Sequence, residues 1–371
     1  MIAKGLEGVV IADSAISLVD GKNGRLLYRG YAIGDLARFS TYEETAYLLL
    51  FGSLPSRAQL ASFSRVLRRS RRLSKPLLEV LAGPCRHLLP IDALRTAVSL
   101  LVQDDPCPGD RSLEAVLERG IRLIALFPSI AATHYRLSQG QKPIAPDATL
   151  GHAANFLWML TGKKPPAEEA RLVDLDLILH AEHSLNASTF AARVTASTLS
   201  DLYAAVTTAV GTLKGPLHGG AASAVVAMLD QIGSESRVRA YIQETVRTHG
   251  RVMGFGHREY KVLDPRVPVM RDVASRLEKG RRYYEILRAL EREMAPLGKK
   301  GIFPNVDLYS GTVYHSLSIP QPLFDPLFAL GRIAGWVAHV HEQLADNRLI
   351  RPRSAYTGPK ARRYVPLEER P

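Results

Sequence analysis

Residues 41–52 read Thr-Tyr-Glu-Glu-Thr-Ala-Tyr-Leu-Leu-Leu-Phe-Gly, and they set the pattern for most of the chain. Thr41 followed three residues later by Glu44 is the sequence signature of a capping box, in which the two side chains satisfy free amides at a helix N-terminus. The apolar residues that follow recur at helical spacing, and Gly52 is a typical helix stop. This stretch therefore predicts a helix.

The same helical pattern, interrupted by Pro or Gly, continues along the rest of the chain. Further helices are predicted near residues 55–70, 90–103, 110–127, 147–161, 166–182, 199–213, 219–232, 236–250, 267–278, 281–294 and 322–347. The one β element predicted is a hairpin within residues 8–30, around the turn-rich sequence Asp-Gly-Lys-Asn-Gly at 20–24. Because strands do not alternate with helices, a doubly wound sheet is disfavoured, and we predict an all-α protein with a short N-terminal β-hairpin.

The length and composition indicate an intracellular globular protein of two compact units. The chain has 371 residues, and a single core stops growing at roughly 250–300 residues. Two cysteines, Cys85 and Cys107, cannot form a disulfide framework or a four-thiolate metal site, which favours a reducing compartment. The sequence has no signal-peptide pattern and no apolar run of the roughly 20 residues that span a bilayer. We therefore expect a cytoplasmic protein with no membrane partner.

The chain is basic, with 48 Lys and Arg against 36 Asp and Glu and a net charge of +12, so it should attract anions. Both acidic metabolites and nucleic acid fit this charge. The densest basic run consists of Arg65, Arg68, Arg69, Arg71, Arg72 and Lys75. Because no stacking aromatic residues interleave these arginines, we interpret the run as a solvated helix end and loop and expect no nucleic-acid partner.

Three stretches in the second half of the chain each present one titratable group among glycines. They read Gly-Pro-Leu-His-Gly-Gly at 215–220, Gly-Phe-Gly-His-Arg-Glu-Tyr-Lys at 254–261 and Asn-Val-Asp-Leu-Tyr-Ser-Gly at 305–311. Glycine lets the backbone approach a ligand closely. The groups presented are His218, His257 and Asp307, and two imidazoles with a carboxylate can remove a proton from carbon and stabilise the resulting charge. The three stretches together predict a carbon acid enzyme.

The surroundings of each group suggest its protonation state and role. His218 precedes a helix-favouring run, whose positive N-terminal end disfavours protonation, so a neutral imidazole could donate to an enolate oxygen. His257 lies in a cationic loop that suits a carboxylate substrate. The apolar neighbours of Asp307 should raise the pKa of its carboxyl group, as a general base requires. Taken singly, each group also has a plainer interpretation: a filled turn, an idle surface histidine or a helix cap.

His180 and His183 lie three residues apart, and paired histidines raise the question of a metal site. A zinc site needs further ligands at clear spacing, and neither cysteine supplies them, so we expect no metal. The sequence also lacks a phosphate-binding Walker loop, a dinucleotide fingerprint and a Gly-x-Ser-x-Gly motif. Nucleotide hydrolysis, hydride transfer and serine hydrolase chemistry therefore have no support.

The three stretches, together with His-Ser-Leu-Asn-Ala-Ser-Thr-Phe at 183–190 and Arg-Pro-Arg-Ser at 351–354, resemble the motifs of the citrate synthase family in its shorter bacterial and archaeal form. The resemblance covers nearly the whole chain. It implies condensation of acetyl-CoA with oxaloacetate to citrate and CoA, with no metal or redox cofactor. It also implies a homodimer of two-domain helical chains, with a large dimerisation domain at 1–219 plus 319–371 and a small inserted domain at 220–318 that forms the active-site cleft.

The same resemblance implies three catalytic roles. Asp307 is expected to abstract a methyl proton from the acetyl group, and His218 to donate a hydrogen bond to the enolate oxygen. His257 is expected to polarise the ketone of oxaloacetate and to protonate the new alkoxide. These roles agree with those suggested by the local surroundings of each group.

The resemblance further implies how the substrates are bound. Family members hold the dicarboxylate with three arginines and a further histidine. The matching positions here are His183, Arg266, Arg332 and Arg351. Arg351 is expected to reach the site of the partner subunit, and Lys261 and Arg353 match positions that contact CoA.

Other functions stay open. 2-Methylcitrate synthases share every motif named and differ mainly in the room left for propionyl-CoA. Departures from the family pattern at Ser184, Ala222, Ser223 and Glu259 remove no catalytic group but weaken the assignment of the acyl substrate. A catalytically silent metabolite sensor or a nucleic-acid binder is less well supported, because the catalytic groups are all present.

Overall fold

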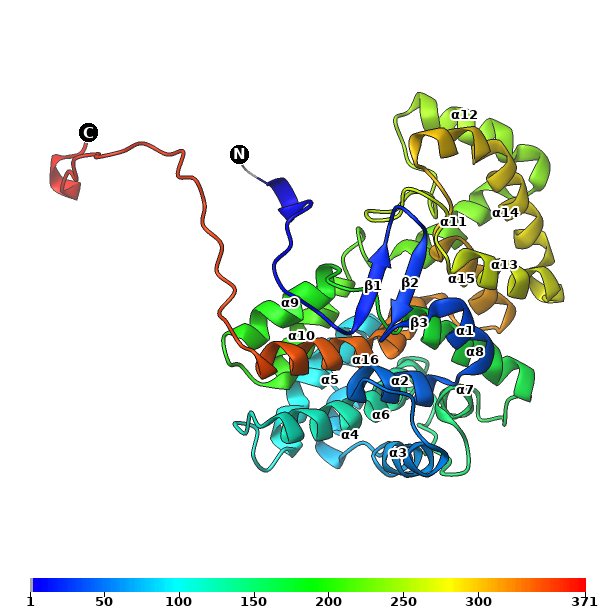
Figure 1. The fold of residues 1–371 in the computed structure, drawn as a ribbon, viewed down its shortest axis with the longest axis horizontal. Coiled ribbons are helices and arrows are strands. Elements are labelled where there is room, and N and C mark those ends of the chain that lie inside the picture. The colour runs from blue at the N-terminus through cyan, green and yellow to red at the C-terminus, as the bar shows by residue number, and fades with distance from the viewer. Residues whose placement is uncertain (1–2) are drawn as a thin grey trace.

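The computed structural model of the protein describes residues 3–371 and is built almost entirely of helices (Figure 1). One small antiparallel sheet near the N-terminus has the strand order β1-β2-β3. The strands are β1 (Ser17–Asp20), β2 (Arg25–Tyr28) and β3 (Tyr31–Ala32). The all-α prediction with an N-terminal hairpin is confirmed, although the strands occupy only part of residues 8–30 and the short third strand was not predicted.

Sixteen α-helices are assigned within residues 3–371. They are α1 (Ile33–Phe39), α2 (Tyr42–Phe51), α3 (Arg57–Arg69), α4 (Lys75–Ala82), α5 (Pro90–Leu100), α6 (Leu113–Ser138), α7 (His152–Thr161), α8 (Ala167–His180), α9 (Ala187–Ser197), α10 (Leu202–Leu213), α11 (Ala221–Ile232), α12 (Val238–Arg247), α13 (Val267–Arg276), α14 (Arg281–Met294), α15 (Asp307–Ser316) and α16 (Phe324–Ala345). Short 3₁₀ turns lie between several of them. Among residues 3–371, no helix is long and apolar enough to cross a membrane.

The start of α2 follows the sequence prediction only in part. The Thr41 hydroxyl accepts the Glu44 backbone N–H at 3.2 Å, and Gly52 ends the helix in the left-handed conformation with φ 84°. The Glu44 carboxylate, however, accepts from the Ser40 hydroxyl at 2.8 Å. A reciprocal capping box is instead present at the start of α3, between Ser56 and Gln59.

Four helices, α1, α4, α9 and α15, were not predicted. α1 and α4 span only seven and eight residues, too short for a clear apolar period. α9 is rich in Ala, Ser and Thr, and α15 buries residues on all of its faces. A helix without an amphipathic pattern is fixed by tertiary packing, which the local sequence does not display.

The core of the protein is centred on α16, which packs against α2, α6, α8, α9 and α10. Almost every residue from Phe324 to Val340 is buried, as expected of a helix enclosed by others. The two longest helices, α6 and α16, touch where α6 carries Gly120. A β-carbon added there would lie 2.2 Å from Cγ1 of Val337, so the close contact requires glycine.

A second group of helices, α11 to α15, packs together beside this core. In Figure 1 the group lies at the upper right, away from α3 to α6. The tip of the β1-β2 hairpin contacts a loop of this group, because the Lys261 backbone N–H donates to the Gly21 carbonyl at 3.0 Å. The group corresponds to the small inserted domain expected at 220–318, whose boundaries stay a prediction.

Two sequence interpretations concern the surface. The basic run, which covers the end of α3 and the loop after it, is mostly exposed, but Arg71 is only 1% exposed and donates to the carbonyls of Asp147 and Leu150. The interpretation of the run as a solvated face is therefore wrong for Arg71, which ties α3 to the segment before α7. The C-terminal residues 351–371 extend away from the body of the protein (Figure 1).

Candidate active site

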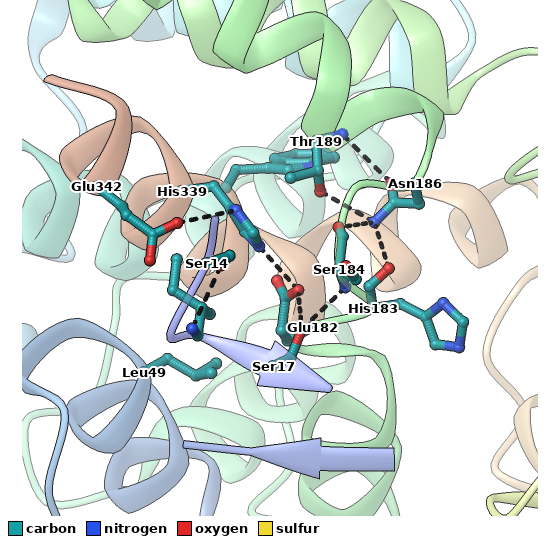
Figure 2. Close-up of polar contacts among 12 residues, drawn as sticks. Ser14, Ser17, Leu49, Glu182, His183, Ser184, Asn186, Thr189, His339 and Glu342 are labelled. Carbon is teal, nitrogen blue, oxygen red and sulfur yellow. Dashed lines mark hydrogen bonds and ion pairs between the residues drawn. The ribbon is translucent and has the colours of Figure 1, made fainter. Parts of the chain in front are cut away.

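The connection between α8 and α9 carries His183, one of the predicted site residues (Figure 2). Asn186 caps α9, because its Oδ1 accepts the Thr189 backbone N–H at 3.2 Å. Ser184 lies in the left-handed region with φ 51°, which turns the chain between the two helices. Figure 2 shows the imidazole of His183 pointing away from the cluster of polar groups around Glu182. The tight turn therefore directs His183 to one side and Glu182 to the other.

Glu182 anchors this connection from inside the core. Its Oε1 accepts from the Ser17 hydroxyl and from Nε2 of His339, both at 2.9 Å (Figure 2). Arg193 donates to Nδ1 of His339 at 3.2 Å, so Nδ1 accepts and Nε2 carries the proton donated to Glu182. Burial opposes ionisation of Glu182, but His339, Arg332 and Ser17 together hold the pKa of its carboxyl group below the ordinary value. A buried anion thus links β1, α16 and the wall of the site.

One face of α16 contacts the walls of the site at helical spacing. The Phe328 ring lies 4.7 Å from the His180 ring and 6.0 Å from the His218 ring. Arg332 donates through Nε to the His180 carbonyl at 2.7 Å. Trp336, one turn further on, donates through Nε1 to the Ser188 hydroxyl at 3.1 Å. These contacts make α16 the rigid support of the site.

Glycine at position 335 permits this close packing. A β-carbon there would lie 2.3 Å from Oε2 of Glu182 and 2.4 Å from the Ala181 carbonyl oxygen. We expect Gly335→Ala to lower the free energy of unfolding by about 1–3 kcal/mol, because the backbone of the connection must move. Thermal unfolding measures this effect, and Gly34→Ala on α1, where an added methyl group meets open space, is the matched control. Equal melting temperatures for the two variants would contradict the packing argument.

His218 is held as a neutral imidazole with a defined tautomer. Its Nε2 lies 2.8 Å from the Ser188 hydroxyl oxygen and faces the Ser188 backbone N–H at 3.4 Å. Since that N–H can only donate, Nε2 accepts and the ring proton lies on Nδ1. Burial lowers the pKa of His218 to about 3, and the Arg332 charge adds to the effect. The neutral state agrees with the sequence prediction, although burial rather than the helix N-terminus is its main cause.

His257 has the opposite tautomer. Its Nδ1 accepts the backbone N–H groups of Glu259 at 3.0 Å and Tyr260 at 3.1 Å, so its proton lies on Nε2. Burial lowers the pKa of His257 to about 4, and the nearby Arg266 contributes. The ring centroids of His257 and His183 are 5.1 Å apart. The His257 ring is therefore neutral, and the two backbone N–H groups of its own loop orient it so that Nε2 is the donor.

The loop of His257 and the segment of Asp307 form one unit. The Asn305 backbone N–H donates to the Gly254 carbonyl, and the Asn305 side chain donates to the Gly256 carbonyl, both at 2.9 Å. Gly254 has φ 78°, and a β-carbon there would lie 2.9 Å from the Leu308 α-carbon. Two of the three predicted stretches, about 50 residues apart in sequence, thus position each other through backbone contacts that a side chain at Gly254 would prevent.

Asp307 is the first residue of α15. Its backbone N–H donates to Oδ1 of Asn305 at 3.1 Å, while its own carboxylate Oδ1 is buried and has no hydrogen-bond partner among the described residues. Burial raises the pKa of Asp307, and the nearby His180 and Arg266 oppose the rise. A carboxylate with a raised pKa and a free oxygen is equipped to accept a proton.

Three groups that could bind an anion surround these residues. Arg266 is fixed by a two-pronged contact with Asp264, at 3.0 and 2.8 Å. Nη1 of Arg332 and Nε2 of His183 are both buried without a hydrogen-bond partner among the described residues. Burial, Arg266 and His257 together lower the pKa of His183 well below its ordinary value. A buried polar group without a hydrogen-bond partner lowers the stability of the fold, unless a bound ligand forms the missing hydrogen bond.

The structure therefore brings together six of the nine predicted site residues. They are His183, His218, His257, Arg266, Asp307 and Arg332. Arg351 and Arg353 lie in the exposed C-terminal extension, outside this cluster. Lys261 is exposed and donates to the Arg258 carbonyl at 3.1 Å.

Sequence reasoning assigned no role to Glu182, Ser188, Trp336 or His339. Ser188 lies within the quoted motif at 183–190, so its hydroxyl could have been considered as a partner of His218. Trp336 and His339 belong to a helix that reads as apolar core, and no sequence signal marks them. Their contacts with the site are between residues about 150 positions apart.

Comparison with known proteins agrees with the geometry. The family model described as "Citrate synthase, C-terminal domain" matches residues 5–353. The chain is 46% identical to citrate synthase of Deinococcus radiodurans, over 100% of this chain and 99% of that protein. It is 42% identical to 2-methylcitrate synthase of Mycobacterium tuberculosis, over 97% and 92% of the two chains.

Two solved structures share the fold over their whole length. Citrate synthase from Thermotoga maritima superposes with a TM-score of 0.91 at 43% identity, covering 100% of this chain and 99% of that one. Citrate synthase from Thermoplasma acidophilum, solved as a ternary complex with carboxymethyl coenzyme A and oxaloacetate, gives a TM-score of 0.94 at 34% identity, with 100% of both chains covered.

Proposed function

The chain belongs to the citrate synthase family, and we propose that it condenses acetyl-CoA with oxaloacetate and water to give citrate and free CoA. One observation carries the proposal: a carboxylate with a raised pKa and two neutral imidazoles of opposite tautomer lie in one partly buried cluster around Arg266 and Arg332. Each group has the protonation state that one step of the condensation needs.

The first step is removal of a proton from the acetyl methyl group. Asp307 is the base, because its carboxylate has a free buried oxygen and a raised pKa. As the proton leaves, negative charge develops on the thioester oxygen. His218 donates from Nδ1 to that oxygen, since its Nε2 faces the backbone N–H of Ser188. A neutral donor that is already in position stabilises the negative charge that develops on the enolate oxygen.

The second step joins the enolate carbon to the ketone carbon of oxaloacetate. His257 donates from Nε2 to the ketone oxygen and transfers this proton to the alkoxide that forms, because its Nδ1 is occupied by two backbone N–H groups. Water then hydrolyses the thioester, which releases CoA. All three groups are protein side chains, and the proposed reaction uses no metal or redox cofactor.

The dicarboxylate is bound by the cationic and neutral donors around the cluster. Arg332 offers the unpaired Nη1, His183 offers the unpaired Nε2, and Arg266 supplies a second fixed guanidinium. Two-pronged contacts from planar guanidinium groups orient a carboxylate firmly. We further propose that Lys261 and Arg353 contact the phosphates of CoA, a polyanion that the net charge of +12 also favours.

We propose a homodimer in which Arg351 completes the partner's site. In a single chain Arg351 is exposed and lies in an extension that leaves the body of the protein. The same extension carries exposed apolar side chains at Tyr356, Tyr364 and Leu367, which a neighbouring chain could cover. A cytoplasmic location, consistent with two free cysteines, belongs to the same proposal.

Thiol release from acetyl-CoA by the purified protein, with and without oxaloacetate, tests the function. We expect release that depends on oxaloacetate, with citrate as the product. Thiol release that does not depend on oxaloacetate, or no thiol release at all, would contradict the proposed function. A protein that binds metabolites without this activity would then be the better interpretation.

A second candidate is 2-methylcitrate synthesis from propionyl-CoA. The observation in its favour is the 42% identity to 2-methylcitrate synthase of Mycobacterium tuberculosis. Comparison of kcat/KM for acetyl-CoA and propionyl-CoA on the same preparation separates the two, and our proposal expects the larger value for acetyl-CoA.

A further inference from the structure

The β1-β2 hairpin has no role in the steps above, yet its two ends contact the backbone on two different sides of the site. Its root is formed by the paired residues Ser17 and Tyr28, and its tip by residues 20–25. Figure 1 shows the tip beside the second group of helices, while the root lies against the body of the protein. One end therefore reaches the connection that carries His183, and the other reaches the loop that carries His257.

The root holds the connection that carries His183. The Ser17 hydroxyl donates to Oε1 of Glu182 at 2.9 Å and accepts the Ser184 backbone N–H at 3.1 Å (Figure 2). The buried Tyr28 hydroxyl donates to the Glu182 carbonyl at 2.9 Å and faces the Glu182 backbone N–H at 3.2 Å. Because His183 lies between these two residues in the chain, the hairpin fixes the backbone on both sides of it.

The tip holds the loop that carries His257. The Gly21 carbonyl accepts the Lys261 backbone N–H at 3.0 Å. A β-carbon at Gly21 would lie 2.2 Å from the Glu259 carbonyl oxygen and 3.3 Å from the Tyr260 nitrogen. This carbonyl and the Tyr260 N–H belong to one peptide group, whose N–H donates to Nδ1 of His257 at 3.1 Å. The tip therefore packs directly on a peptide group that orients the His257 ring.

The glycine at the tip is required by this contact and not by the turn. Gly24 has φ 63°, a conformation that favours glycine in a tight turn. Gly21, in contrast, is outside the left-handed region, so the turn alone would accept a side chain there. The Glu259 carbonyl is what excludes one. The lack of a side chain at position 21 thus serves the approach of the hairpin to the His257 loop.

We propose that the β1-β2 hairpin positions His257 relative to His183, with Gly21 as the positioning residue that directs Nε2 of His257 to the ketone oxygen. The inference rests on the proposed function. The ring centroids of the two histidines are 5.1 Å apart, although only the hairpin contacts described above join their two backbones to one element. The four paired positions of the hairpin connect root to tip over about 10 Å. A catalytic donor that shifts by about 1 Å loses much of its effect.

Gly21→Ala tests the proposal, because the added methyl group displaces either the Glu259 carbonyl or the tip. The resulting shift of the His257 ring should lower kcat by about tenfold to hundredfold. It should also weaken the hydrogen bond to the ketone of bound oxaloacetate, so the infrared stretching frequency of the isotope-labelled ketone should be higher than in the wild-type complex. This frequency reports on the donor at the ketone, and a general loss of stability would not change it.

Two further variants complete the experiment. Asp20→Ala loosens the tip without adding bulk, because the Asp20 carboxylate accepts the backbone N–H of Asn23 at 3.0 Å and its side-chain amide at 2.8 Å. These contacts are exposed, so the variant should fold and should show the same two changes to a smaller extent. Gly34→Ala is the same substitution as Gly21→Ala in open space on α1, and it should leave kcat and the ketone frequency unchanged.

The ketone frequency decides the outcome. A higher frequency together with a lower kcat in the tip variants would support the proposal, and Asp20→Ala alone decides if Gly21→Ala does not fold. An unchanged frequency in the tip variants, whether or not turnover falls, would overturn it, because the hairpin would then be only structural. A wild-type protein that does not consume oxaloacetate would instead contradict the proposed function, so the two failures can be told apart.

Discussion

Asp307→Asn is expected to lower kcat by about 10²–10⁴-fold, the range for loss of a general base. The amide keeps the size of the side chain and cannot accept a proton at neutral pH. Affinity for oxaloacetate should change little, because the donors assigned to the dicarboxylate are His183, Arg266 and Arg332. Steady-state kinetics give kcat, and calorimetric titration with oxaloacetate gives the affinity.

The matched control for this variant is Asp272→Asn. Asp272 lies on α13, where its exposed carboxylate pairs with Arg276 at 2.6 Å. Exposed pairs contribute about 0–1 kcal/mol, so the control should retain normal turnover. Turnover of Asp307→Asn within twofold of wild type would remove Asp307 from the role of base.

The second large effect concerns the partner subunit. Chains with Arg351→Ala alone and chains with Asp307→Asn alone should each form nearly inactive dimers. A purified heterodimer of one chain of each kind should recover about half of the wild-type activity, because one of its two sites combines an intact Asp307 with an intact Arg351 from the other chain. Activity per heterodimer, isolated with two different affinity tags, is the measurement.

The control heterodimer places both substitutions in one chain and pairs it with a wild-type chain. If Arg351 serves the neighbouring site, this heterodimer has no complete site and should be nearly inactive. If every site is built within one chain, the two results reverse: the control recovers half the activity and the test heterodimer recovers none. The design therefore separates the two arrangements without assuming either.

The sequence predicted those features whose cause is local. A neutral imidazole at His218, a substrate-facing imidazole at His257 and a carboxyl group with a raised pKa at Asp307 could be inferred, because glycine-rich motifs and apolar or cationic neighbours are visible along the chain. The all-α fold followed from apolar periodicity, and the N-terminal hairpin from its turn sequence. The pKa values depend mainly on burial, which apolar neighbours indicate only indirectly.

Features that depend on distant contacts could not be predicted. α15 is buried on all sides and shows no amphipathic period, so the helix that begins at Asp307 was missed. Arg71 reads as one more arginine in a surface run, and only the segment around Asp147 makes it a buried donor.

The central claim is that Asp307, His218 and His257 surround the same pair of reacting groups: Asp307 and His218 act on the acetyl group, and His257 acts on the ketone of oxaloacetate. A crystal structure of the protein with oxaloacetate and carboxymethyl-CoA, whose carboxymethyl group stands in for the acetyl enolate, tests it most directly. The account predicts the Asp307 carboxyl group within hydrogen-bond distance, about 2.5–3.0 Å, of the inhibitor's carboxylate, which takes the place of the acetyl methyl group, with Nδ1 of His218 on the same carboxylate and Nε2 of His257 on the ketone oxygen. Ligands bound away from these three side chains, or an inhibitor carboxylate out of contact with Asp307, would contradict it.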